Sequence, residues 1–143
     1  MIVDPDFLDH WRTRMLVDAL GGYDTALTTV KELIGIAGGD DCFPELALES
    51  LGKNRIIADG AEIVRRNPDI ILGSWCGKKF RPENVAAREG WAEVNAVRHK
   101  QLFEIKSPDI LQPGPAALTD GVRKMHALFL QWMDADLAGA FKP

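Results

Sequence analysis

Apolar residues near the start of the chain recur at three- and four-residue steps. The repeat runs from Asp6 to Leu20, and its apolar positions are Phe7, Leu8, Trp11, Met15, Leu16, Ala19 and Leu20. This period is typical of a helix with one apolar stripe, and the pair Gly21-Gly22 is a common way for a helix to end. The pattern therefore predicts a helix over residues 6–20.

A second helix is predicted from Asp24 or Thr25, either of which can cap it, to the pair Gly38-Gly39, which ends it. Its apolar series is Leu27, Val30, Leu33, Ile34 and Ala37. The next segment, residues 40–54, has no sustained period and contains a proline and a glycine. We expect a connection there, with one helical turn at most.

From residue 55 onward, short apolar runs alternate with short helical segments. Residues 55–59 and 101–106 are rich in strand-forming side chains. Residues 69–73 (DIILG) form a continuous apolar run, which is typical of a parallel strand covered by helices on both faces. This run is the predicted centre of the sheet.

Helices are predicted between these strands. Residues 59–67 read as a short helix with Asp59 as its cap and Glu62 three positions later, as in a capping box. Pro82 is well placed to begin another helix, because a proline lacks only an N–H that has no partner in the first turn. Gly90 is expected to end that helix.

The end of the chain combines an irregular segment with a long helix. Residues 107–115 contain three prolines and are expected to be irregular. From Pro115 a helix of about 25 residues, ~37 Å long, is predicted to lie across the domain. Its apolar stripe is Leu118, Val122, Met125, Phe129 and Trp132. The fold class is therefore α/β: a three-layer sandwich with a small, mostly parallel central sheet flanked by helices and a long C-terminal helix.

Composition narrows the class of protein. A chain of 143 residues fits a single domain. A net charge of −4 provides no clustered positive field, so nucleic acid is not an expected partner. The charged N-terminal stretch does not resemble a signal peptide, and no apolar run approaches the ~20 residues of a membrane span. As written, the chain is expected to be cytoplasmic.

The cysteines and histidines do not form a convincing catalytic or metal site. Cys42 and Cys76 lack the spacing of a zinc site or a disulfide scaffold. Lysines beside Cys76 could lower the pKa of its thiol, so a small thiol-dependent enzyme is an alternative. However, His10, His99 and His126 have no spacing that brings one of them to Cys76 as a base. We therefore expect neither catalysis nor a bound metal, and no glycine pattern indicates a nucleotide.

The loop over residues 74–81 leaves the carboxyl end of the predicted central strand, where open α/β sheets bind ligands. Trp75 offers an aromatic face and an N–H donor beside Cys76, and three cations could hold phosphate or carboxylate groups. These cations are Lys78, Lys79 and Arg81. The alternative is a tryptophan that covers the edge of the core beside solvated charges.

Three further residues complete the candidate binding site. Trp91 could form a second aromatic wall of the same cleft, although it could equally close the end of the preceding helix. Ser107 and Gln112 could donate hydrogen bonds from a backbone stiffened by proline. The alternative for these two is a stiff surface turn.

Three stretches of the sequence resemble one known family. They are residues 32–51 (ELIGIAGGDDCFPELALESL), 58–80 (ADGAEIVRRNPDIILGSWCGKKF) and 90–122, which ends in PGPAALTDGV. In this order they resemble the C-terminal lobe of class III substrate-binding proteins of ABC importers, which serve vitamin B12 and iron-siderophore uptake. The GGDDCF and NPDIIL blocks together are more specific than either alone.

The resemblance implies a binding protein and not an enzyme. Its implied ligand is cobalamin or an iron complex such as a ferric chelate, and its implied partner is an ABC permease. Family members dock onto permease arginines through an acidic residue on each lobe, and Glu62 matches that position here. The family is periplasmic or otherwise extracytoplasmic, which contrasts with the location expected from the start of this chain.

Departures from the family shape the expected domain organisation. Residues 30–143 read as the C-terminal lobe, and residues 1–29 as an N-terminal helical segment that does not resemble the family. With the first lobe missing, the cleft has one wall, while firm binding commonly requires ~70–90% burial of the ligand. Affinity is expected to be poor unless chains pair as a homo-oligomer.

The N-terminal stripe of Phe7, Trp11 and Met15 could cover the surface that the absent lobe shields in the family. A structural fragment without ligand is the remaining alternative.

Overall fold

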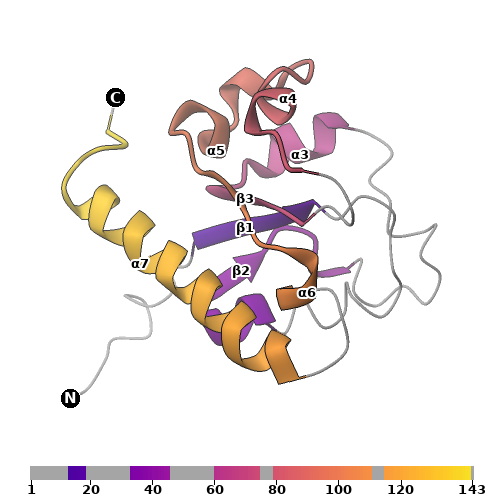
Figure 1. The fold of residues 1–143 in the computed structure, drawn as a ribbon. Coiled ribbons are helices and arrows are strands. Elements are labelled where there is room, and N and C mark those ends of the chain that lie inside the picture. The colour runs from indigo at the N-terminus through magenta and orange to yellow at the C-terminus, as the bar shows by residue number, and fades with distance from the viewer. Residues whose placement is uncertain (1–12, 19–32, 46–59, 75–78, 111–114, 143) are drawn as a thin grey trace.

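Within the part of the chain that the structure describes, a four-stranded parallel sheet forms the centre of the fold (Figure 1). The computed structural model describes residues 13–18, 33–45, 60–74, 79–110 and 115–142. The strands lie side by side in the order β2-β1-β3-β4. Their bounds are β1 Thr13–Asp18, β2 Gly39–Asp41, β3 Ile70–Gly73 and β4 Leu102–Glu104.

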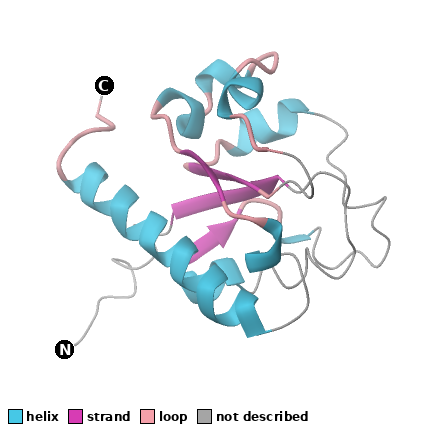
Figure 2. Ribbon diagram, in the orientation of Figure 1, coloured by secondary structure: helices cyan, strands magenta, loops and turns pink. Residues whose placement is uncertain are grey.

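Helices cover both faces of this sheet (Figure 2). One face carries α3 (Gly60–Arg66), α4 (Pro82–Ala86), a 3₁₀ turn (Trp91–Glu93) and α5 (Asn95–Arg98). The other carries a helix over residues 33–37, α6 (Ser107–Ile110), a π-helical turn (Ala117–Gly121) and α7 (Val122–Leu137). The predicted three-layer α/β sandwich is confirmed. Among the helices of the described ranges, none has the length and apolar character needed to cross a bilayer.

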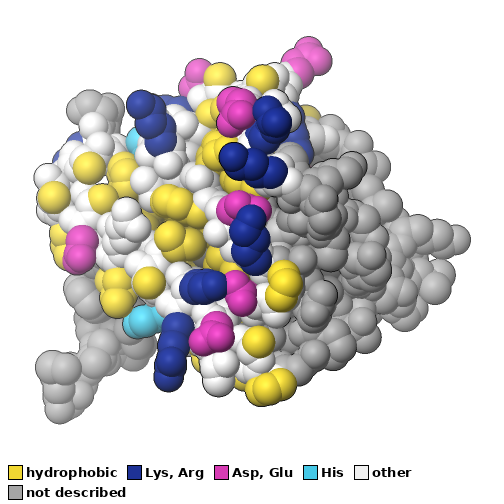
Figure 3. All heavy atoms as spheres, viewed as in Figure 1, with side chains coloured by type: hydrophobic (Ala, Val, Ile, Leu, Met, Phe, Trp, Pro, Cys, Tyr) yellow, Lys and Arg dark blue, Asp and Glu magenta, His cyan; other side chains and the backbone are white. Residues whose placement is uncertain are grey.

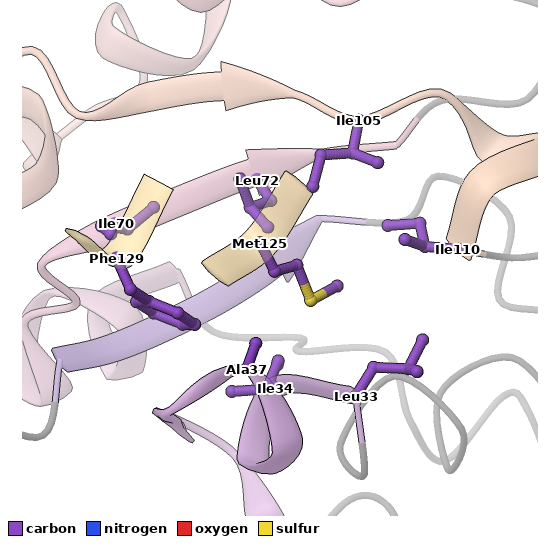
Figure 4. Close-up of a cluster of buried hydrophobic side chains, with 9 residues drawn as sticks. All are labelled: Leu33, Ile34, Ala37, Ile70, Leu72, Ile105, Ile110, Met125 and Phe129. Atoms are coloured by element: carbon purple, nitrogen blue, oxygen red, sulfur yellow. The ribbon is translucent and has the colours of Figure 1, made fainter. Parts of the chain in front are cut away.

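Alternating side chains of β3 build the two halves of the core. Ile70 and Leu72 are fully buried against α7, while Ile71 is fully buried on the opposite face. The first half contains Leu33, Ile34, Ala37, Ile70, Leu72, Ile105, Ile110, Met125 and Phe129 (Figure 4). Since every residue of β3 is buried, its apolar run fits a strand covered on both faces.

The helix expected over residues 6–20 is wrong where the structure describes this segment. Thr13–Asp18 is a strand that pairs in parallel with both β2 and β3, so it lies inside the sheet. The apolar run Met15-Leu16-Val17 is long enough for a buried strand, and a run this short does not separate strand from helix by its period. Met15 therefore belongs to no helical stripe, while residues 1–12 and 19–32 lie outside the described ranges.

Two further elements differ from the prediction. The strand β2 occupies residues expected to be a connection, because an edge strand of three residues leaves no periodic pattern. The helix α6 occupies Ser107–Ile110, which were expected to be irregular. Pro108 is the second residue of α6, and a proline at that point removes no helical hydrogen bond.

Most other boundaries agree with expectation. The elements α3, β3, β4 and α7 lie where the pattern predicts them, and Pro82 begins α4. Gly38 ends the helix over residues 33–37 with a φ of 104°, a conformation that favours glycine. The helix α4 ends at Ala86, four residues before Gly90. The strand predicted over residues 55–59 lies outside the described ranges.

Candidate functional site at the carboxyl edge of the sheet

Three neighbouring strands end in one row. Asp18 of β1 pairs with Gly73 of β3, and Gly73 pairs with Glu104 of β4. Because the strands are parallel, the segments that follow them emerge at the same edge of the sheet. Open parallel sheets bind ligands beyond this carboxyl edge.

Phe80 fixes the segment that returns from this edge toward α4. Its side chain is buried, and the ring lies directly against Gly73, where it occupies the space that a Cβ atom would need. Lys79 and Arg81 flank Phe80 and are both exposed. The buried ring therefore holds two cations in solvent next to the end of β3.

The end of β4 is linked electrostatically to the segment that follows β3. Lys106 donates a hydrogen bond of 3.0 Å to the Glu104 carboxylate. This bond is the main reason why the pKa of Glu104 lies below its usual range, with smaller contributions from the Phe80 backbone N–H and the charge of Lys79. In Figure 3, basic and acidic side chains alternate along a column beside the grey residues.

Ser74 adds a polar group directly after β3. Its side chain is fully buried, and its Oγ atom has no hydrogen-bond partner within the described ranges. A buried hydroxyl without a partner costs roughly 1–3 kcal/mol. This edge therefore combines Ser74 with the exposed cations Lys79, Arg81 and Lys106.

The structure describes only part of the predicted binding site. Lys79 and Arg81 lie at the expected edge. The remaining loop residues Trp75, Cys76 and Lys78, together with Gln112, lie outside the described residues. Ser107 begins α6, directly after the β4 edge.

Trp91 is a packing residue in this structure. It is 3% exposed and belongs to the core half that contains Ile63, Val85 and Val94. The guanidinium of Arg88 lies over its ring, 4.6 Å from the centroid. Of the two alternatives for Trp91, this burial favours closing the end of the α4 segment over forming a ligand wall.

Glu62 lies in the first turn of α3, and its carboxylate accepts hydrogen bonds from Arg65 and Arg66. Arg66 also pairs with Glu45 at 2.5 Å and donates to the Cys42 carbonyl at 2.8 Å. These bonds hold the pKa of Glu62 and of Glu45 below the ordinary value of 4.5. Sequence reasoning missed the long-range part of this network, because Glu45 and Cys42 are distant from Arg66 in the sequence and follow no motif with it.

Two cavities border the sheet. An open one of about 580 Å³ borders the edge strand β2 and is lined by Gly35, Gly39, Asp40, Asp41, Cys42, Pro44, Glu45 and Arg66. A second of about 330 Å³ lies at the opposite, amino edge of the sheet. Within the described part of the chain, no group of three His, Cys, Asp or Glu residues is placed to hold a metal ion.

Comparisons with known proteins place this fold in a family. The family model described as periplasmic binding protein matches residues 21–108. The uncharacterized ABC transporter substrate-binding lipoprotein YvrC of Bacillus subtilis is 32% identical over 63 residues, which are 44% of this chain and 19% of that protein.

A solved structure shares the fold. The periplasmic vitamin B12 binding protein BtuF of Vibrio cholerae superposes with a TM-score of 0.56 at 16% identity, over 90% of this chain and 49% of BtuF. The chain thus spans about half the length of BtuF. Because the family model covers more than half of the sequence, the chain belongs to the class III branch of the periplasmic binding proteins, which are binding proteins and not enzymes.

Proposed function

We propose that this chain is the C-terminal lobe of the substrate-binding component of an ABC importer, and that it binds cobalamin or a ferric chelate. The observation that carries the proposal is the shared carboxyl edge of β3 and β4 in a fold similar to BtuF. Ligands of parallel α/β sheets bind at this edge. The importer role also implies an extracytoplasmic location for the assembled protein.

Different observations support each of the two proposed ligands, cobalamin and a ferric chelate. The similarity to BtuF, a vitamin B12 binding protein, favours cobalamin. The exposed cations Lys79, Arg81 and Lys106 suit the anionic groups of a ferric chelate, or the phosphate of cobalamin. With Trp91 buried, Trp75 is the remaining candidate for stacking on a flat corrin ring.

We further propose that Glu62 is the acidic contact of this lobe with an ABC permease. Its side chain is 31% exposed, so it is accessible from solvent. Its carboxylate already bonds to Arg65 and Arg66. A permease arginine would therefore share or replace these two partners, and the charge reversal Glu62→Arg is expected to abolish docking without loss of ligand binding.

A thermal-shift panel tests the ligand. Cyanocobalamin, a ferric hydroxamate chelate and ferric citrate are each titrated against the purified chain. The true ligand stabilises the fold by ~2.7 kcal/mol when it reaches a hundred times its dissociation constant. A flat melting temperature with all three compounds would refute the ligand assignment.

A further inference from the structure

A cavity of about 330 Å³ lies at the amino edge of the sheet, opposite the proposed ligand edge. Its lining residues are Asp69, Asn95, Arg98, His99, Trp132, Asp136 and Phe141. Asp69 directly precedes β3, and His99 follows α5 shortly before β4. The cavity is therefore a separate feature of the fold, and its size is within the range of small-molecule sites.

One wall of this cavity is aromatic. The rings of His99 and Phe141 stack with their centroids 4.7 Å apart and an angle of 25° between their planes. Phe141 also contacts Trp132 of α7, with 5.5 Å between the centroids. Three rings from three separate segments thus form one continuous surface, which suits a planar or cationic ligand.

The polar part of the lining is mainly acidic. The Asp136 carboxylate is half-buried and has no ion-pair partner within residues 13–18, 33–45, 60–74, 79–110 and 115–142. Asp69 is also half-buried and accepts a hydrogen bond of 3.2 Å from the Asn95 amide. The Asn95 backbone N–H donates in turn to Asn67 at 2.7 Å, which helps to hold this side of the cavity in place.

Among the described residues that line the cavity, the one cation is Arg98, which is exposed. Solvent screens an exposed charge more strongly than a half-buried one. The half-buried carboxylates of Asp69 and Asp136 are therefore less screened than Arg98 among the described lining residues. Aromatic faces beside carboxylates are the combination that recognises organic cations.

We propose that this cavity binds a small organic cation with a planar body, of the amine or amidine class. The cationic group lies toward Asp136 and Asp69, and the planar body lies against His99 and Phe141. This site is independent of the ligand proposed for the carboxyl edge, so either assignment can fail without the other.

The indole N–H of Trp132 provides a local reporter. Its Nε1 atom is buried and has no hydrogen-bond acceptor within the described ranges. In ¹H–¹⁵N NMR spectra it gives one indole signal, which the variant Trp132→Phe assigns by its disappearance. Benzamidine is titrated as the probe, with neutral benzamide and anionic benzoate as compounds of matched shape.

Benzamidine is expected to shift this signal saturably, whereas benzamide and benzoate leave it in place. Asp136→Asn is expected to weaken benzamidine binding about five-fold, as for a partly exposed charge pair. The control Asp134→Asn changes an exposed carboxylate of the same helix that does not line the cavity, and it should have no effect. An equal response to benzamide or benzoate, or unchanged affinity in Asp136→Asn, would overturn the proposal.

Discussion

The ring of Phe129 in α7 occupies the space in which a side chain of Gly39 would begin, at the first residue of β2. Phe129 is 2% exposed and packs in the core half of Figure 4 with Ile34, Ala37 and Ile70. The missing side chain of Gly39 thus lets α7 approach the edge strand β2. This contact explains why a glycine is needed at the start of β2.

Gly39→Ala is therefore expected to destabilise the protein by about 1–3 kcal/mol, because the ring or the strand has to move. Urea unfolding measures the difference. Gly35→Ala is the matched control, since a Cβ atom there meets nothing within 4 Å. Gly35 lies inside a helix, so this control should be neutral or stabilising by up to ~1 kcal/mol. Equal stability of Gly39→Ala and the wild type would contradict the packing account.

Arg66 is expected to stabilise the fold in a pH-dependent way. The folded pKa values of Glu45 and Glu62 lie below 4.5, mainly because each carboxylate bonds to Arg66. A lowered carboxyl pKa stabilises the folded state above the unfolded value, and this contribution is lost as the pH falls through the folded value. Arg66→Met should therefore be less stable than the wild type near neutral pH, and this difference in stability should narrow as the pH falls below 4.5 and through the folded pKa values.

Part of the stability difference between Arg66→Met and the wild type should remain at acidic pH. Arg66 also donates to the Cys42 carbonyl and lies over the Phe43 ring at 4.1 Å, and neither contact requires an ionised glutamate. Arg65→Met is the control, because Arg65 is more exposed than Arg66 and pairs with Glu62 of the same helix. Urea unfolding at neutral and acidic pH measures how far each variant differs from the wild type in its free energy of unfolding. A gap for Arg66→Met that stays constant with pH would exclude the carboxylate network as its source.

Two variants of Trp91 distinguish a packing role of this side chain from a role in ligand binding. Because the side chain is 3% exposed, Trp91→Ala is expected to cost about 3–5 kcal/mol. Trp91→Phe keeps an aromatic ring, so it should fold and lose less stability. Calorimetric titration of this milder variant should give the wild-type affinity for the ligand. A large loss of affinity in a well-folded Trp91→Phe protein would favour the ligand wall instead.

The sequence predicts those elements whose pattern has one physical explanation. A fully apolar run such as residues 70–72 fits a doubly covered strand, and the stripe through Met125 and Phe129 fits a long helix across a sheet. Residues 13–18 were predicted wrongly, because the spacing of Met15 and Leu16 suits a helix as well as a strand. Tertiary pairing with β2 and β3 decides between these two structures.

The site was predictable only in outline. The loop after β3 was placed at the ligand edge because parallel strands share the direction of their carboxyl ends. The Glu104–Lys106 pair is local, joining residues two apart at the end of β4. The packing of Phe80 on Gly73 and the position of Gly73 beside Glu104 arise only in the folded sheet, so no local pattern reveals them. The aromatic cavity at the amino edge likewise joins residues 69, 99, 132 and 141 through the fold alone.

The central claim is that ligand binds at the carboxyl edge of β3 and β4. Isothermal titration with the ligand from the thermal-shift panel compares the wild type with the double variant Lys79→Ala/Arg81→Ala. The control Arg98→Ala/Lys142→Ala removes the same charge from exposed residues elsewhere, with Arg98 at the amino edge. We predict at least a tenfold loss of affinity for the first variant and wild-type affinity for the control. Equal affinity in all three proteins, or a loss confined to the control, would contradict the proposed site.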